Sequence, residues 1–296
     1  MQSPIRNISD TALWMAMYRA FESERADALF HDPFARRLAG DRGAAIVSAL
    51  PHGRSMAWAM VVRTAVIDEI VLDCVARGAA TVLNLGCGLD TRAYRLPLPA
   101  RLHWLDVDLP AMVAYRRAGL KGEAAACDHV DVAADLGERG ALAEVFALVH
   151  ACAGPALVVT EGLLVYLAQG QVDSLAQELH REPRIRWWLT DLIAPLLLKT
   201  VGGCWRPYLA EARAPLRFAP DQVGSYFDPL GWHESEFRSI WDESIRLRRP
   251  APLSWFWGPL GALSFPGAQQ SLQRMASVVL LDRRRARVGA SPAASP

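Results

Sequence analysis

Hydrophobic residues in the first part of the chain recur at the three- and four-residue spacings of amphipathic helices. Residues 9–30 show this period behind two N-cap candidates, Ser9 and Asp10. After a break at Pro33, a shorter helical pattern follows that we expect to end at Gly40. A further helix is expected in residues 57–78, with an apolar stripe at Val62, Val66, Ile70 and Cys74.

After residue 78 the pattern changes to short apolar runs that are bounded by turn residues and separated by helical segments. Such alternation is typical of βαβ units, and it predicts an α/β fold with a mostly parallel sheet. The expected strands cover residues 80–86, 102–108, 126–132, 156–162, 184–191 and 275–282, with 244–249 as a weaker candidate.

Residues 196–232 interrupt this alternation, because they combine Gly, Pro and Trp with no clean period. We interpret them as an insertion over the sheet of a single domain, residues 1–286. In that domain residues 1–60 form a helical lid and residues 61–286 form the core. The tail, residues 287–296, has the small, polar and Pro-rich composition of a disordered segment.

The bulk composition narrows the kind of protein and of partner. The chain has 296 residues, of which 52% are hydrophobic, enough for a large core. Its net charge of +1 argues against general nucleic-acid binding and favours a small, roughly neutral partner. The N-terminus lacks the apolar run of a signal peptide, and no uncharged apolar run reaches the roughly 18 residues that span a bilayer. We therefore expect a cytoplasmic protein without membrane contact, and no pattern points to a particular oligomeric state.

Cysteines and tryptophans carry weaker signals. The five cysteines are widely spaced, without a C-x-x-C pair or a neighbouring histidine at zinc-ligand spacing, so we expect free thiols and no metal site. Large aromatic side chains line sites for flat ligands, but they also fill cores. Because the second half of the chain has little periodicity, we slightly favour a pocket for its tryptophans, among them Trp187, Trp188, Trp205, Trp232, Trp255 and Trp257.

Two glycines, Gly86 and Gly88, follow the first expected strand and let the backbone approach a ligand closely. Alone they fit a plain turn, a dinucleotide cradle or a site for another nucleoside. Thr91 occupies the place of the third small residue in the dinucleotide fingerprint, which argues against NAD. Asp108 ends the second strand twenty residues after Gly88, where a carboxylate can accept both hydroxyls of an adenosine ribose. The alternative for Asp108 is a solvated carboxylate at a strand end.

Two further carboxylates follow the next strands. Asp135 can accept a hydrogen bond from an adenine amino group while Leu136 lies against the ring; equally, Asp135 can cap the following helix. Glu161 lies where an apolar strand meets Gly162. A carboxylate so close to buried residues is costly unless it is paired, so we expect a cationic or donor-rich ligand as its partner. S-adenosyl-L-methionine supplies an ammonium and a sulfonium group.

Several motifs occur together and in order over roughly residues 9–170. The chain carries the helical run "SDTALWMAMYRAFESERADALFHDPFARRLAG", then "VVRTAVIDE", "NLGCGLDTRAYRL", "DVDLP", "ADL" and "TEGLLVYL". With these motifs it resembles the leucine carboxyl methyltransferase family, and within it the bacterial branch of polyketide O-methyltransferases of the tetracenomycin-pathway type. Eukaryotic members use a lysine in the N-terminal helix near their phosphatase-tail substrate, whereas residues 14–16 here read Trp-Met-Ala.

The resemblance implies a class I S-adenosyl-L-methionine-dependent methyltransferase. Its fold is a seven-stranded, Rossmann-like sheet with an antiparallel strand near one edge and an N-terminal helical lid. By the same resemblance, Arg63 pairs with the carboxylate of the cofactor, a role that suits the bidentate guanidinium. The other implied contacts are Gly86 and Gly88 with the methionine part, Asp108 with the ribose, Asp135 and Leu136 with the adenine, and Glu161 nearby.

The acceptor decides whether a catalytic base is needed. A carboxylate is already ionised at neutral pH, whereas a phenol with a pKa near 10 benefits from a base. Tyr18 and Arg19 in the first helix, together with Tyr166, are our candidates for facing the acceptor, although each also suits an ordinary packing or surface role. No catalytic residue is assigned.

Three functions follow in order of preference. The first is an O-methyltransferase that modifies a carboxylate or phenolic hydroxyl of a small, aromatic, polyketide-like secondary metabolite. The second is a non-catalytic protein that binds S-adenosyl-L-methionine or S-adenosylhomocysteine and regulates or scaffolds a partner. The third is an NAD-dependent oxidoreductase, which Thr91 disfavours.

Overall fold

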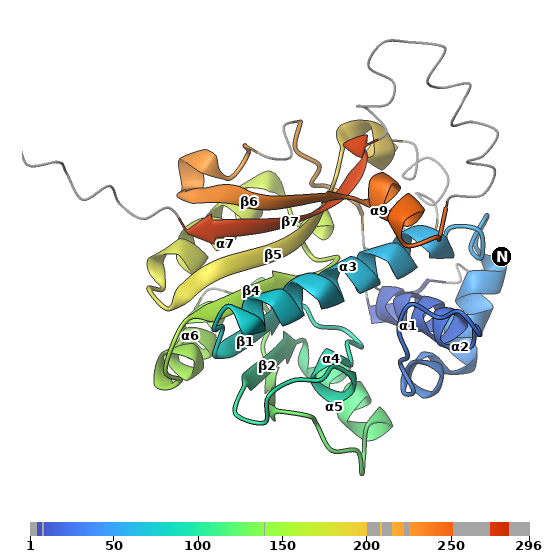
Figure 1. Cartoon of the computed structure of the whole chain (residues 1–296), viewed down its shortest axis with the longest axis horizontal. Helices are drawn as coiled ribbons and strands as arrows, with labels where there is room; N and C mark the ends of the chain where they lie inside the picture. The colour runs from blue at the N-terminus through green and yellow to red at the C-terminus, as the bar shows by residue number, and fades with distance from the viewer. Residues whose placement is uncertain are drawn as a thin grey trace, which may run out of the picture.

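Seven strands form one sheet with the order β3-β2-β1-β4-β5-β7-β6 (Figure 1). In this computed structural model the described residues are 5–7, 9–138, 140–199, 208, 215–221, 225–250 and 273–283. The strands are β1 (Thr81–Leu85), β2 (His103–Asp108), β3 (Asp128–Ala133), β4 (Ala156–Thr160), β5 (Ile185–Ile193), β6 (Trp232–Ser239) and β7 (Ala276–Arg283). Every neighbouring pair is parallel except those of β7, which runs antiparallel to β5 and β6. The expected Rossmann-like sheet with an antiparallel strand near one edge is confirmed.

Helices precede the sheet and connect its strands. They are α1 (Ser9–Ser23), α2 (Ala35–Ala49), α3 (Ala57–Ala76), α4 (Arg92–Arg95), α5 (Pro110–Gly119), α6 (Ala141–Ala151), α7 (Gln169–Arg181) and α9 (Ile240–Arg246), with short 3-10 turns at η1 (Leu164–Tyr166) and η2 (Asp228–Leu230). Within the part of the chain that the structure describes, no helix has the length and apolarity needed to cross a membrane.

Six of the seven expected strands are confirmed, and the weaker candidate, residues 244–249, is wrong. These residues fall in and after α9, whose N-cap Ser239 accepts a hydrogen bond from the backbone N–H of Asp242 through its side chain. Acidic residues in the first turn and Arg246 in the last favour a helix here. The sequence prediction missed β6, because this strand is mostly polar and only its two end residues are buried.

Apolar side chains of the sheet alternate between its two faces. Leu83 and Val158 pack with α6 and α7 on one face. Val82 and Val159 point to the other face, which α3 crosses (Figure 1). Because β1 and β4 are buried along their whole length, their sequences are nearly continuous apolar runs.

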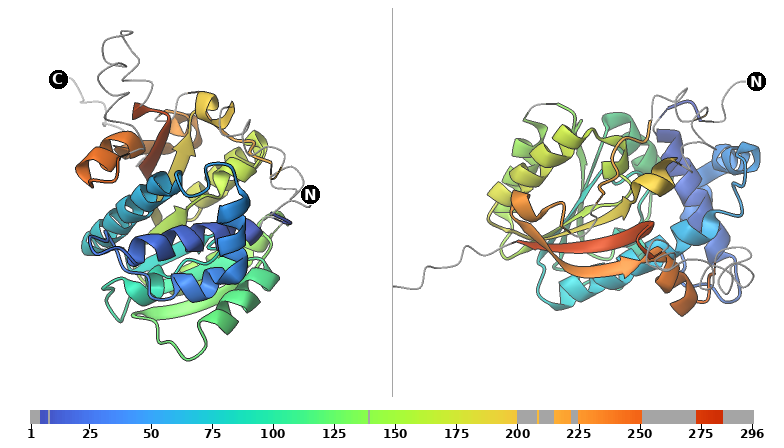
Figure 2. Two further views of the ribbon diagram at one scale, coloured as in Figure 1. Left: turned by 90° about the vertical axis from the view of Figure 1, so that its right-hand side faces the viewer. Right: turned by 90° about the horizontal axis from the view of Figure 1, so that it is seen from above.

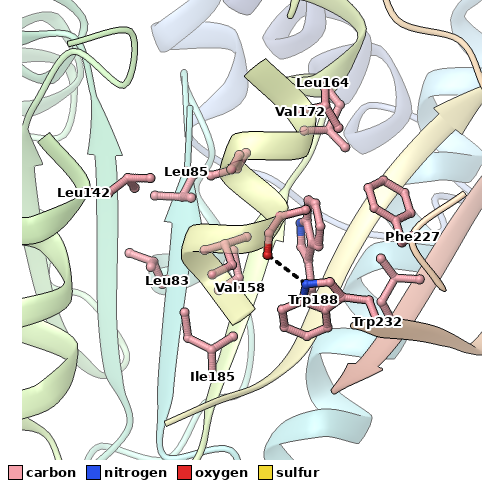
Figure 3. Close-up of a cluster of buried hydrophobic side chains, with 14 of the residues drawn as sticks. Leu83, Leu85, Leu142, Val158, Leu164, Val172, Ile185, Trp188, Phe227 and Trp232 are labelled. Carbon is pink, nitrogen blue, oxygen red and sulfur yellow. Dashed lines mark hydrogen bonds between the residues drawn. The ribbon is translucent and has the colours of Figure 1, made fainter. Parts of the chain in front are cut away.

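Three of the named tryptophans belong to this core, so the slight preference for a pocket is wrong for those three. Trp187, Trp188 and Trp232 are 0% exposed. Figure 3 shows Trp188 and Trp232 beside Phe227, and the ring centroid of Trp188 lies 4.9 Å from that of Phe227. The other three named tryptophans, Trp205, Trp255 and Trp257, lie outside the described residues.

The first two helices, α1 and α2, pack on one another at the carboxyl end of the parallel strands (Figure 2). Leu13 and Met17 of α1 are buried, as in an amphipathic helix, but α1 ends at Ser23 and does not continue to residue 30 as expected. The second helix does not end at Gly40 but bends there, where φ is 57°, and continues to Ala49. Burial of Ile46 and Val47 against α1 favours this continuation. Parts of the expected insertion and the whole expected tail lie outside the described residues.

Candidate functional site

A cavity of about 960 Å³ opens at the carboxyl ends of β1, β2, β4 and β5, beneath α1 and the start of α3. In open parallel sheets, ligands bind at this edge, and ligand pockets measure roughly 300–1,000 Å³. The cavity has the size for a nucleoside cofactor together with a second small molecule. It is lined by all the residues predicted for the site, namely Tyr18, Arg19, Arg63, Gly86, Gly88, Asp108, Asp135, Leu136, Glu161 and Tyr166.

The turn after β1 needs glycine at both ends. Gly86 and Gly88 have φ values of 65° and 52°, which side chains rarely tolerate. A Cβ on Gly86 would lie 3.0 Å from Leu163 Cδ1, and one on Gly88 would lie 3.1 Å from the Cβ of Ala12. The bare backbone therefore forms part of the cavity floor.

Asp108 connects this turn to the end of β2. Its Oδ2 accepts from the backbone N–H of Gly88 and its Oδ1 from that of Leu109, both at 2.7 Å. Burial raises the pKa of Asp108, although these two hydrogen bonds oppose the shift. Asp108 is thus a half-buried, hydrogen-bonded carboxylate at the cavity wall and not a fully solvated one.

Asp135 and Leu136 lie in the loop after β3. Asp135 is exposed, and its Oδ1 accepts from the backbone N–H of Gly137 at 2.8 Å. It does not cap the next helix, because α6 begins at Ala141 with Gly140 in the N-cap position. Leu136 packs against the core below the cavity.

Glu161 has two protein partners of positive charge, and the cationic ligand expected beside it stays a prediction. Its Oε1 lies 2.9 Å from Arg63 Nη2, and its Oε2 lies 2.6 Å from Arg92 Nη1. Burial alone would raise the pKa of Glu161, but Arg92 and Arg63 lower it. The carboxylate is therefore ionised and held between two guanidinium groups.

Arg63 is held from two sides by carboxylates. Besides Glu161, it contacts Asp191, whose Oδ2 lies 2.9 Å from Arg63 Nη1. Asp191 Oδ1 accepts from the backbone N–H of Gly162 at 2.6 Å, so β5 is tied to the end of β4. Asp191 was not among the predicted site residues, although its place near the end of a strand, like that of Glu161, was a usable signal.

Arg92 is a second residue that the sequence analysis missed. It is 2% exposed, and its Nε donates to Asp68 Oδ1 at 2.6 Å while its Nη1 donates to Asp90 Oδ2 at 2.6 Å. The signal was present in "LDTRAYR", a run rich in charged residues directly after the glycine turn. Its partners come from α3, from the turn after β1 and from the end of β4.

The three candidates for the acceptor side all line the cavity, and each also engages another protein group. The hydroxyl of Tyr18 donates to the carbonyl oxygen of Gly53, and burial raises the pKa of Tyr18. Arg19 donates to Asp32 Oδ2 at 2.8 Å. Burial raises the pKa of the half-buried Tyr166, and a side-chain hydrogen bond with Thr11 opposes that shift. The apolar part of the wall includes Met15, Trp58, Met60, Leu197, Phe218 and Trp241.

Thr91, which stands in place of the third small residue of the dinucleotide fingerprint, has a structural role of its own. It is fully buried in the N-cap position of α4, and its hydroxyl donates to Asp32 Oδ2 at 2.7 Å. Because Asp32 also binds Arg19, this contact links the glycine turn to the N-terminal helices. A third glycine at position 91 would remove that link.

A sequence profile described as leucine carboxyl methyltransferase matches residues 12–180, more than half of the chain. The chain belongs to the leucine carboxyl methyltransferase family. A relative from Frankia alni is 34% identical over 256 residues, which cover 81% of this chain and 87% of that protein. One from Streptomyces coelicolor is 37% identical over 175 residues, or 56% of this chain. Both are named "putative S-adenosyl-L-methionine-dependent methyltransferase".

The match spans 62% of the length of the Streptomyces coelicolor protein. Two solved structures are similar to nearly the whole chain of this family member, although their sequence identity to it is low. A DUF574 family protein from Streptomyces avermitilis has a TM-score of 0.58 at 13% identity, covering 91% of this chain and 97% of its own. A "putative methyltransferase" from Thermobifida fusca has a TM-score of 0.55 at 13% identity, covering 95% and 96%. At this identity the likeness concerns the fold alone.

The cavity of this leucine carboxyl methyltransferase family member carries more negative than positive groups. Among the described lining residues, three arginines face seven carboxylates, which are Asp90, Asp108, Asp135, Glu138, Glu161, Glu178 and Asp191. A cleft with one predominant sign of charge concentrates ligands of the opposite sign. The site therefore suits a ligand that carries a positive group.

Proposed function

We propose that this chain is an S-adenosyl-L-methionine-dependent O-methyltransferase. Its acceptor would be a carboxylate or phenolic hydroxyl of a small, aromatic, polyketide-like molecule. The observation that carries the proposal is the cavity itself, where the glycine turn, Asp108 and the carboxylate-rich floor meet an apolar wall. A cationic nucleoside and an apolar acceptor fit these two parts.

The residues at the floor suit the parts of the cofactor. The bare turn at Gly86 and Gly88 gives room beside the methionine part, and Asp108 offers carboxylate oxygens to the ribose hydroxyls. Glu161 suits the ammonium group and Arg63 suits the carboxylate. When bound, the cofactor supplies a methyl group on a sulfonium that is already a good leaving group.

The adenine would lie in the loop after β3. We assign Asp135 to its amino group and Leu136 to its ring, because both line the same cavity as Asp108. The N-terminal residues 1–60 would act as a lid, since α1 contributes Ala12, Met15 and Tyr18 to the cavity wall. For methyl transfer the chain then has to align the reactants and keep water out.

Binding and turnover test the proposal separately. Isothermal titration with S-adenosyl-L-methionine should give a saturable heat, and absence of binding would contradict the proposal. Methyl transfer should then be screened on aromatic carboxylic acids and on phenols of matched ring size. A rate that rises with pH indicates a phenol, whereas a flat profile above about pH 6 indicates a carboxylate, which ionises near pH 4.

A non-catalytic binding protein is the second candidate. It is favoured by the contacts of Tyr18 and Arg19, whose polar atoms are engaged by Gly53 and Asp32 within the protein. Formation of S-adenosylhomocysteine with any acceptor excludes it. Binding without turnover over the whole acceptor panel supports it.

A further inference from the structure

Arg92 belongs to a chain of alternating charges at the cavity floor, with Glu161 at its centre. The chain runs from Asp68 on α3 through Arg92, Glu161 and Arg63 to Asp191 on β5, with contacts of 2.6 to 2.9 Å. Each oxygen of Glu161 is taken by a different arginine. The order of charges leaves each ion beside partners of opposite sign, which offsets the cost of burying it.

The guanidinium of Arg92 joins three parts of the fold. Its Nε reaches Asp68, and its Nη1 reaches both Asp90 and Glu161. Arg95 holds the other end by binding both oxygens of Asp68 at 2.6 and 2.8 Å. A planar guanidinium presents several donors in fixed directions, which a lysine cannot do.

We propose that Arg92 is the positioning residue that fixes Glu161, and through it Arg63, where the amino-acid part of the cofactor binds. The inference rests on the proposed function. Arg92 acts through Glu161, so its loss changes the place and the protonation of that carboxylate. Among the described residues, the charged groups that act on Glu161 are Arg92 from α4, Arg63 from α3 and Asp90 from the turn after β1. Asp191 from β5 binds the same Arg63.

The consequence is a change in pH dependence. In the wild type, Arg92 and Arg63 keep the pKa of Glu161 below its usual range, so the carboxylate stays ionised and the affinity for S-adenosyl-L-methionine is flat between about pH 6 and 7, below the pH at which an α-ammonium group loses its proton. Without Arg92, only Arg63 opposes burial and Asp90, so the pKa of Glu161 rises relative to that in the wild type. The affinity then weakens by up to about tenfold for each pH unit below that raised pKa.

The test measures the dissociation constant of S-adenosyl-L-methionine against pH for Arg92→Gln, Arg92→Lys and Arg95→Gln. Arg95 is the matched control, since it is 3% exposed in the same helix and also binds Asp68. We expect Arg92→Gln to bind about tenfold more weakly at neutral pH, with a further loss at acid pH. Arg92→Lys should restore the flat profile but not the full affinity. Arg95→Gln should lower the melting temperature without changing the profile.

A double-variant cycle separates positioning from general damage. In a Glu161→Gln background, Arg92→Gln should have little further effect on affinity, because the residue through which it acts no longer titrates. Equal effects in both backgrounds, or a wild-type profile for Arg92→Gln, would overturn the assignment of Arg92 alone. A wild type that does not bind S-adenosyl-L-methionine would instead overturn the proposed function.

Discussion

Two buried ionic clusters support the sheet, and they differ in what they face. The cavity cluster consists of Arg63, Asp68, Asp90, Arg92, Arg95, Glu161 and Asp191. The β2–β3 cluster consists of Asp106, Arg116, Arg117, His129 and Asp131. Five members of the first cluster line the cavity, whereas no member of the second is among the described lining residues.

The ion pairs of the β2–β3 cluster form among its own members, although Arg116 Nε also donates to the carbonyl oxygen of Asp90 at 3.0 Å. Arg116 is 1% exposed and donates to both Asp106 and Asp131, His129 Nε2 lies 2.8 Å from Asp106 Oδ2, and Arg117 binds Asp131 from outside. The two carboxylates and the histidine lie close enough together to resemble a metal site, but the arginines already supply the positive charge.

The cavity cluster has an excess of negative charge instead. Its four carboxylates are paired with three arginines. In the β2–β3 cluster, two carboxylates are matched by two arginines. The balanced charges of the β2–β3 cluster suit a role in stability, whereas the excess of carboxylates in the cavity cluster suits a cationic ligand.

The largest effect on the free energy of unfolding is expected in the β2–β3 cluster. Arg116→Met leaves Asp106 and Asp131 buried without their main partner, which costs about 3–5 kcal/mol of unfolding free energy. Urea denaturation of the cofactor-free protein measures this loss. The control is Arg117→Met, because Arg117 also binds Asp131 but is 61% exposed, and an exposed pair contributes about 0–1 kcal/mol. Equal losses for the two variants would contradict the importance of the buried arginine.

The second effect is expected in the cavity cluster, where a substitution should change the affinity for S-adenosyl-L-methionine more than the stability of the fold. Arg63→Met removes the proposed partner of the cofactor carboxylate, and we expect the dissociation constant of S-adenosyl-L-methionine to rise about 100-fold. The free energy of unfolding should fall less than in Arg116→Met, because Glu161 keeps Arg92 and Asp191 keeps the N–H of Gly162.

Titration calorimetry and urea denaturation together check this prediction. Arg77→Met is the control, since Arg77 ends the same helix but is 38% exposed and pairs with exposed Asp73. Arg77→Met should change neither the dissociation constant of S-adenosyl-L-methionine nor the free energy of unfolding by much. If Arg63→Met lost stability but kept its affinity, the two clusters would serve the same purpose.

Asp108→Asn separates the effect of a half-buried charge on the stability of the fold from its effect on cofactor affinity. Burial raises the pKa of Asp108 in the folded protein. A raised pKa means that this group stabilises the fold below its unfolded pKa of about 3.9 and that this contribution is lost as the pH rises through the folded pKa. At neutral pH the amide removes the cost of the charge but accepts only one of the two N–H bonds, so stability should change by less than about 1 kcal/mol. The affinity for S-adenosyl-L-methionine should fall about tenfold or more, as for the loss of a hydrogen bond to a charged group.

Thermal unfolding against pH and titration calorimetry measure the two effects. As the pH falls from 7 to about 4, the wild type should gain stability relative to Asp108→Asn, because only the wild-type carboxyl takes up a proton. Asp135→Asn is the control for stability, since Asp135 is exposed, and it should change the melting temperature little. An unchanged affinity in Asp108→Asn would remove Asp108 from the proposed site.

The same contrast explains how far the sequence could predict the molecule. Strands β1 and β4 were predictable because burial on both faces gives nearly continuous apolar runs, whereas the polar edge strand β6 gives no such signal. Residues at strand ends, such as Asp108 and Glu161, were predictable because parallel strands place their carboxyl ends at one edge. The arginines that pair with Glu161 were not predictable, because this pairing depends on contacts that are distant in sequence.

Arg63 and Asp191, for example, are 128 residues apart along the chain. Sequence patterns placed Arg63 on a helix and Asp191 on a strand, but neither pattern predicts that these two side chains form an ion pair. For the same reason, only a ligand was expected beside Glu161, whereas the fold also brings Arg63 and Arg92 to it. Local periodicity predicts elements and their ends, while charge pairing is a property of the assembled layers.

The smallest effect is expected at Tyr18, which lines the cavity although its hydroxyl is bound within the protein. Tyr18→Phe loses the hydrogen bond to the carbonyl oxygen of Gly53, at a cost of about 1 kcal/mol of unfolding free energy. The matched control is Tyr115→Phe, because the hydroxyl of Tyr115 also donates to a backbone oxygen, that of Leu38, but on a side chain that is 46% exposed. Denaturation and the rate of methyl transfer are measured together. A rate that falls well beyond the loss of stability would mean that the Tyr18 hydroxyl leaves Gly53 to meet the acceptor, and the ligand-binding region would then extend onto α1.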